Sequence, residues 1–85
     1  MNANPSPQAA YTPLDEHRRM LRLQIGDDGM IDVLMTLPDS YFGLTAAQQA
    51  DVFSRMVHHV NRGVTDTVKL VSLGMSVLEP ASVNA

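Results

Sequence analysis

Two adjacent histidines, His58 and His59, are the first side chains that could do chemistry. Neighbouring side chains on a helix point about 100° apart, whereas two metal ligands on one helix usually stand one turn apart. No carboxylate or cysteine stands one turn away from either histidine. We therefore expect surface histidines and no metal site, with a modest pH-dependent interface as the alternative.

Two carboxylate clusters also lack the spacing of a known site. Asp27, Asp28 and Asp32 miss the alternating ligands and the terminal glutamate of a calcium loop. We interpret them as turn chemistry. Residues 15–17, Asp-Glu-His, place carboxylates beside an imidazole, but no nucleophile motif accompanies them. The sequence therefore predicts no enzyme, no catalytic residues and no cofactor.

The overall charge argues against general nucleic-acid binding. The 85 residues carry a net charge of -3, whereas a nucleic-acid binder needs a basic face. Arg18, Arg19 and Arg22 form the cationic cluster of the sequence, and Asp15 and Glu16 offset it. The chain contains no cysteine, which fits a reducing, cytoplasmic location. No apolar run approaches the roughly 20 residues of a membrane span.

One small domain at residues 14–79 is expected between two tails. Residues 1–13 contain three prolines, which disfavour helices and central strands, so they predict a flexible N-terminal arm. Pro80 ends the last element, and residues 80–85 are expected to form a C-terminal tail. Chains of this size are often marginal alone, and oligomerisation commonly supports them.

Residues 18–37 have the alternation of a β-hairpin. Apolar residues recur at every second position on both sides of a Gly-Asp-Asp-Gly segment at 26–29, which is the pattern of two strands joined by a turn. The apolar positions are Leu21, Leu23, Ile25, Ile31, Val33, Met35 and Leu37. The competing interpretation is a helix over residues 15–25, with Leu14, Arg18, Leu21 and Ile25 in register.

Residues 45–79 carry a long helical stripe. Apolar residues recur at spacings of three and four, and Thr45 followed by Gln48 matches a capping box, with Leu44 as a hydrophobic staple. The region is expected to be one long or kinked amphipathic helix. Gly63 offers a C-terminal stop, which would give two helices, the second capped by Thr65 or Asp66. A strand over residues 70–78 is a further alternative.

The C-terminal half of this helix is predicted to face a partner. Hairpin strands would reach about 20–27 Å, whereas a continuous helix would be about 50 Å long. The stripe after Gly63 would then face water, which soluble monomers seldom allow. Either the helix folds back at Gly63 and closes a monomer, or another chain covers the stripe, and we favour the second. The predicted protein interface consists of Val64, Val68, Val71, Met75 and Leu78.

These features together predict a small α+β protein that binds proteins. We expect a homo-oligomeric regulator, inhibitor or assembly subunit without catalytic activity, most simply a twofold homodimer. The alternative is a ribbon-type DNA-binding regulator, in which Arg22 and Gln24 would point outward from the hairpin. Asp32 on the same ribbon and the acidic composition oppose that alternative.

Overall fold

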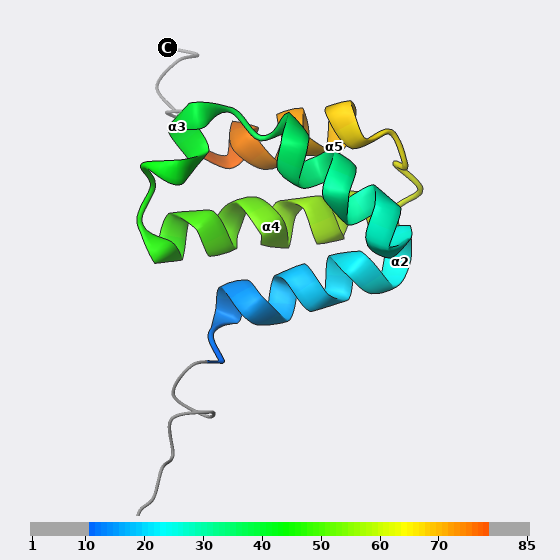
Figure 1. Ribbon diagram of the computed structural model, residues 1–85, viewed down its shortest axis with the longest axis horizontal. Helices are drawn as coiled ribbons and strands as arrows, with labels where there is room; N and C mark the ends of the chain where they lie inside the picture. Colours follow the sequence, from blue (N-terminus) through cyan, green and yellow to red (C-terminus); the bar gives the residue numbers. More distant parts are fainter. Residues whose placement is uncertain (1–10, 79–85) are drawn as a thin grey trace, which may run out of the picture.

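Helices form the whole of the regular structure between residues 11 and 78, which are the residues that the computed structural model describes. A bent helix comes first, a single helical turn follows, and two further helices complete the domain (Figure 1). The elements are α2 (Pro13–Thr36), α3 (Asp39–Phe42), α4 (Ala46–Asn61), α5 (Thr67–Met75) and the 3-10 turn η1 (Ser76–Leu78).

Helix α2 starts at a capping box and bends at Gly26. The Thr12 hydroxyl accepts a hydrogen bond from the Asp15 backbone N–H at 3.2 Å, and the Asp15 carboxylate accepts one from the Thr12 N–H at 3.0 Å. Pro13 occupies the first turn, where its missing donor costs nothing. Gly26 has φ 79° and ψ 176°, a conformation open essentially to glycine alone. It divides α2 into a first arm, residues 13–25, and a second arm, residues 27–36.

The predicted β-hairpin at 18–37 is wrong, and with it the α+β class, because residues 11–78 contain no strand. A strand would place Leu21 and Leu23 on one face, but Leu21 is fully buried and Leu23 is exposed. In the second arm, Met30, Val33 and Leu37 are buried at helical spacing. The competing helix over 15–25 is therefore the one that forms.

The glycine-aspartate segment does mark a break, but between two helical arms. Asp27 and Asp28 follow Gly26 directly and fall in the first turn of the second arm. Carboxylates are favourable there, because the N-terminal end of a helix carries a partial positive charge. The same composition that suits a hairpin turn therefore also suits a helix start.

The region 45–79 forms two helices and not one, and the strand alternative for 70–78 is wrong. The Thr45–Gln48 capping box of α4 is confirmed, with hydrogen bonds of 3.0 and 3.1 Å. Gly63 ends α4 at φ 102°. The Val64 N–H reaches the His59 carbonyl at 3.1 Å, which is the long bond of a Schellman motif. Asp66 caps α5 by accepting from the Lys69 N–H at 3.2 Å.

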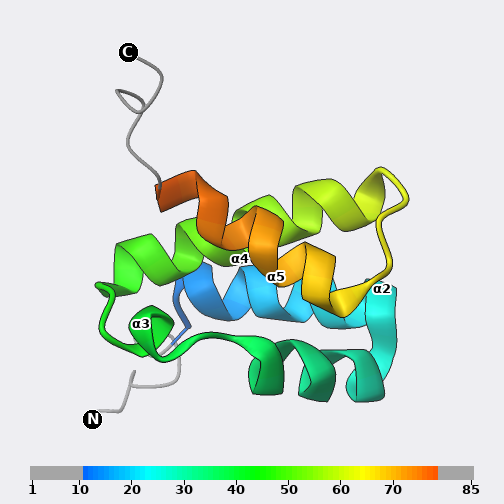
Figure 2. The ribbon, with the colours of Figure 1, turned by 90° about the horizontal axis from the view of Figure 1, so that it is seen from above.

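Helix α4 is the central element. It contacts both α2 and α5, and α2 also contacts α5, so that three helices enclose one core (Figure 2). Helix α5 approaches α4 closely because Gly74 is buried between Val52 and Met56. The side chains with no exposed surface are Leu21, Val33, Tyr41, Val52, Phe53, Met56 and Leu70.

Both predicted tails fall largely outside the described part of the chain. Residues 1–10 of the expected N-terminal arm and the whole of the expected tail at 80–85 lie there. Pro13, the last residue assigned to the arm, is the first residue of α2. None of the helices described within residues 11–78 has the length and apolar character needed to cross a bilayer.

Candidate functional site

The histidine pair lies on α4 without other metal ligands nearby. The two rings meet edge to face with centroids 5.0 Å apart, and His58 is exposed whereas His59 is half-buried. Burial lowers the pKa of His59, and the charges of His58, Arg55 and Arg62 lower it further. No group of three histidine or carboxylate side chains that could hold a metal occurs among residues 11–78.

The carboxylates of residues 15 and 16 have structural partners. Asp15 closes the capping box of α2. The Glu16 carboxylate accepts a hydrogen bond from the Tyr11 hydroxyl and pairs with the Arg19 guanidinium at 2.7 Å. The hydrogen bond from Arg19, followed by that from Tyr11, lowers the pKa of Glu16. His17 faces a hollow between the starts of α2 and α4, and its Nδ1 finds no hydrogen-bond partner within the described residues.

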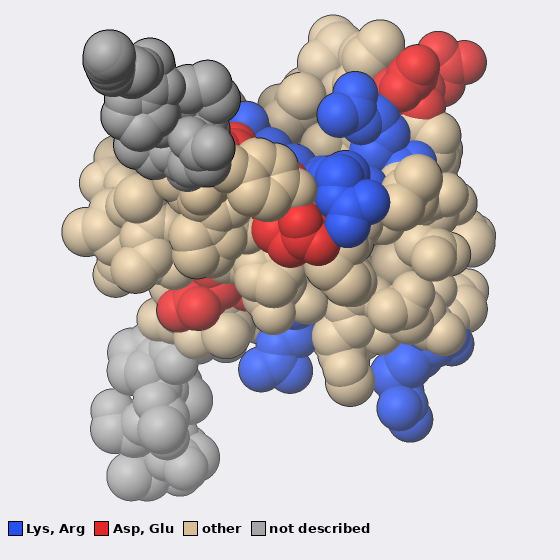
Figure 3. Space-filling model, turned by 90° about the horizontal axis from the view of Figure 1, so that it is seen from below, with Lys and Arg blue, Asp and Glu red and all other residues tan. Residues whose placement is uncertain are grey.

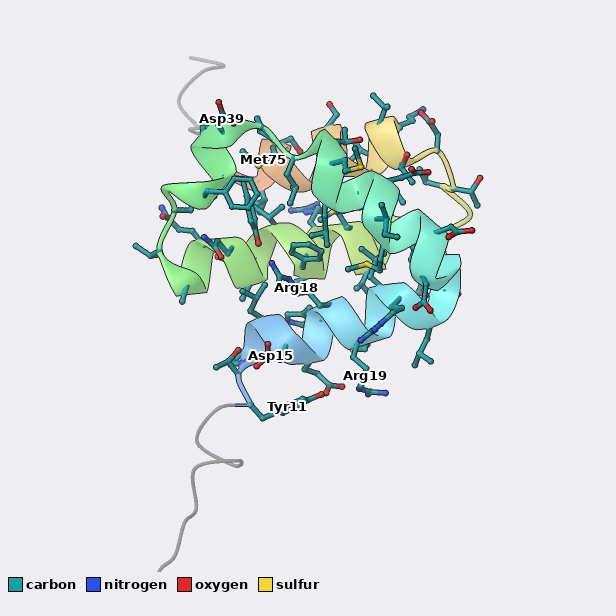
Figure 4. All side chains as sticks on the ribbon, in the orientation of Figure 1. Tyr11, Asp15, Arg18, Arg19, Asp39 and Met75 are labelled. Atoms are coloured by element: carbon teal, nitrogen blue, oxygen red, sulfur yellow. The ribbon has the colours of Figure 1, made fainter. Side chains whose placement is uncertain are left out.

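Of the three clustered arginines, Arg18 and Arg22 stand one helical turn apart and line the same hollow, whereas Arg19 lies on a different face of the first arm. Figure 4 shows Arg18 directed towards α4, whereas Arg19 lies on the outer face near Tyr11. Arg22 makes a long contact of 4.0 Å with the exposed carboxylate of Asp27. On the face shown in Figure 3, positive and negative side chains lie beside one another and form no continuous basic surface.

Arg18 has an unusual position for a cation. Its residue is half-buried, and the guanidinium carbon lies 5.2 Å from the centroid of the fully buried Phe53 ring, within cation–π range. Its Nε is buried and has no hydrogen-bond partner, and no ion pair forms at Arg18 within residues 11–78. The Arg18 charge therefore interacts with the face of the Phe53 ring, and no carboxylate of the described residues pairs with it.

Tyr41 lies near this guanidinium. Its side chain is fully buried, and its hydroxyl also lacks a hydrogen-bond partner within the described residues. Burial raises the pKa of Tyr41, and the nearby Arg18 charge opposes that increase. A buried hydroxyl without a partner is rare in folded proteins, because its hydration is lost without replacement.

A groove opens between the two arms of α2. Its volume is about 360 Å3, and cationic and apolar side chains share its walls. The lining residues are Arg18, Arg22, Asp27, Met30, Ile31 and Leu34. We call this hollow the elbow groove.

Apolar side chains continue from the groove onto the outer surface of the second arm. Ile31, Leu34 and Met35 are 53%, 38% and 80% exposed. Their spacing of three and four places them along one side of the helix. We call this set the α2 strip.

The residues of the predicted interface differ in how much of their surface is exposed. Val71 is 4% exposed and belongs to the core, whereas Val68 is 62% exposed at the start of α5. Val64, Met75 and Leu78 are partly buried and pack against the core of their own chain. Within one chain, most of the stripe after Gly63 is thus covered by α2 and α4, and its association role stays a prediction.

Sequence reasoning missed the elbow groove, although one signal pointed to it. In the alternative helix over 15–25, Arg18 falls in register with Leu14, Leu21 and Ile25. A cation within an apolar row is a position that requires a partner. The second wall was hidden, because Met30, Ile31 and Leu34 join the site only through the bend at Gly26.

No known protein family, curated protein or solved structure matches the chain.

Proposed function

We propose that the chain is a non-catalytic, cytoplasmic protein-interaction module that self-associates, acting as a small regulator, inhibitor or assembly subunit. The α2 strip is the observation that supports this function. Ile31 and Met35 expose more than half of their surface although the chain has a complete core elsewhere. Adjacent exposed apolar side chains on a small domain are typical of surfaces that another chain covers.

A second copy of the chain is the partner we favour. Association commonly supports small domains, and twofold pairing covers the same patch on both copies. Val68 is a separate exposed apolar residue on α5. Through it, the interface predicted from the sequence after Gly63 can still be tested. The DNA-binding alternative is withdrawn, because its ribbon is absent from residues 11–78.

Light scattering coupled to size exclusion tests the proposal at micromolar concentrations. The wild-type chain should elute with a mass above its monomer mass of 9.3 kDa. Met35→Asp should return it to the monomer, because a carboxylate would be buried in the interface without a partner. Val68→Asp is the matched variant on α5, and both side chains are exposed, so neither change should unfold the domain.

The outcomes of these experiments show whether the α2 strip or the Val68 face of α5 forms the interface. Loss of association with Met35→Asp alone assigns the interface to the α2 strip. Loss with Val68→Asp alone would return it to α5 and overturn the role of the strip. A wild-type chain that remains monomeric up to roughly 100 µM would contradict the self-association proposal, because the dissociation constant of any homodimer would then lie above that concentration.

A further inference from the structure

The elbow groove contains a cation that lacks a counter-ion. Arg18 is half-buried, its Nε has no hydrogen-bond partner, and no carboxylate pairs with it within residues 11–78. A guanidinium that has lost part of its hydration binds carboxylates strongly, because the hydrogen bonds are charge-assisted and can be bidentate.

The charge in the groove selects a monoanion. Its lining contains two arginines and one aspartate, so the formal charge is 2 − 1 = +1. Asp27 already lies 4.0 Å from Arg22, so that Arg18 is the arginine of the groove without a carboxylate partner among the described residues. A phosphate or dicarboxylate would bring a second negative charge towards the Asp27 carboxylate, which opposes its binding.

The opposite wall of the groove is apolar. Met30, Ile31 and Leu34 come from the second arm, one turn or less apart, and face the two arginines of the first arm. Their side chains offer a surface for a hydrocarbon group attached to the anion. Sites for small molecules commonly combine a mainly apolar wall with a few polar groups that fix the orientation.

We propose that the elbow groove is a binding site for an amphiphilic monocarboxylate, a carboxylate carried on a short hydrocarbon chain. The carboxylate accepts hydrogen bonds from the Arg18 and Arg22 guanidinium groups. The hydrocarbon chain lies against Met30, Ile31 and Leu34. This binding goes beyond the proposed self-association and does not require it.

Octanoate is the probe, and methyl NMR of the full chain is the measurement. The sequence contains two isoleucines, Ile25 and Ile31. Ile31 lines the groove, whereas Ile25 is partly buried and packs against the core. Octanoate should shift the Ile31 methyl signals in a saturable manner and move those of Ile25 less. Acetate and octylamine test the hydrocarbon chain and the carboxylate separately.

Arginine variants identify the anion-binding side chain. Arg18→Gln should raise the dissociation constant of octanoate at least about tenfold, since hydrogen bonds to charged groups are among the strongest in proteins. Arg19→Gln is the matched control from the same arm, because Arg19 lies on the outer face and is already paired with Glu16. Its effect should stay within about twofold.

A second pair of variants covers the case in which Arg18→Gln fails to fold. Arg22 and Leu34 are exposed, so Arg22→Gln and Leu34→Asp should preserve the fold by circular dichroism. Both should weaken octanoate binding, the first by removing a cation and the second by adding a competing carboxylate.

Three results would overturn the proposal. The first is an Ile31 methyl signal that stays unchanged up to the highest octanoate concentration below micelle formation. The second is binding of octylamine as tight as that of octanoate, which would mean adhesion to apolar surface alone. The third is equally tight binding of acetate, which would mean an adventitious ion only. All three are read at protein concentrations where light scattering shows the monomer alone, so that neither the success nor the failure of self-association affects them.

Discussion

Tyr41 is a residue whose hydroxyl group should cost stability. The side chain is fully buried and the hydroxyl has no hydrogen-bond partner within residues 11–78. Removing an unsatisfied buried polar group returns part of its desolvation free energy. Tyr41→Phe should therefore raise the free energy of unfolding by about 1 kcal/mol, measured by urea denaturation.

Tyr11→Phe is the control for this change. The Tyr11 hydroxyl is hydrogen-bonded to the exposed Glu16, so its removal should alter the free energy of unfolding by less than about 0.5 kcal/mol. A loss of stability in Tyr41→Phe would show that the hydroxyl has a partner in solution, with Arg18 the nearest candidate.

His59 should make the stability depend on pH. Its pKa is lowered in the folded chain by burial and then by His58, Arg55 and Arg62, so the unfolded chain binds the proton more tightly. The contribution is complete above the unfolded pKa of about 6.5 and is lost as the pH falls through the folded value. Urea unfolding at about pH 7.5 and 5.5 should show this loss in the wild type.

His59→Gln should flatten that pH dependence, whereas His58→Gln, at an exposed ring, should keep most of it. The lowered pKa of Glu16 does not interfere, because that carboxylate starts from 4.5 and titrates below the chosen window. If the free energy of unfolding of His59→Gln depended on pH as it does in the wild type, His59 would not be the cause of that dependence, and another titrating group would be.

At the scale of the elements, the contact of α4 with α5 depends on Gly74. A β-carbon there would lie 2.8 Å from Met56 Cγ and 2.9 Å from the Val52 carbonyl oxygen. Such overpacking costs about 1–3 kcal/mol, and the better helix propensity of alanine offsets about 1 kcal/mol of it. Gly74→Ala should therefore lower the free energy of unfolding, as thermal or urea denaturation would measure.

Gly43→Ala provides the comparison for Gly74→Ala. Gly43 has φ −91°, open to any residue, and its β-carbon would meet the Ser40 carbonyl oxygen at an ordinary 3.7 Å. The change should be within about 0.5 kcal/mol. If Gly74→Ala changed the free energy of unfolding as little as Gly43→Ala, the contact of 2.9 Å between the added β-carbon and the Val52 carbonyl oxygen would not exist in solution. Helices α4 and α5 would then lie further apart.

Sequence patterns predicted some elements well and others poorly, for physical reasons. Local signals sufficed where the chain itself carries the hydrogen bonds, as in the Thr45–Gln48 capping box and the stop at Gly63. They failed at α2, because a short window admits both a strand through Leu21, Leu23 and Ile25 and a helix through Leu21 and Ile25. Packing against α4 decides between them by burying Leu21 and leaving Leu23 exposed.

The candidate site was less predictable than the elements that form it. The interface hypothesis took Val71 as a surface residue, because the stop at Gly63 indicates a possible chain reversal but does not show that α5 packs onto α4 and α2. The elbow groove depends on the angle between two arms, which the backbone of one residue, Gly26, determines. Periodicity gives the face of each arm, but it contains no information about that angle.

At the scale of the whole molecule, the groove and the α2 strip share residues. Ile31 and Leu34 line the elbow groove and also form two of the three members of the strip. A hydrocarbon chain in the groove would cover surface that a second copy needs. If both proposals hold, octanoate binding and self-association therefore oppose each other by thermodynamic linkage.

Octanoate should accordingly shift wild-type light scattering towards the monomer mass. At a ligand concentration tenfold above its dissociation constant, the apparent association should weaken about tenfold for each protomer that must release ligand. Arg18→Gln should keep its self-association but lose this response, because Arg18 lies in the groove and outside the strip, whereas Arg19→Gln should respond as the wild type does. An unchanged mass while the Ile31 methyl signals report saturation would show that partner and ligand occupy separate surfaces, and self-association would then have to use a face such as that of Val68.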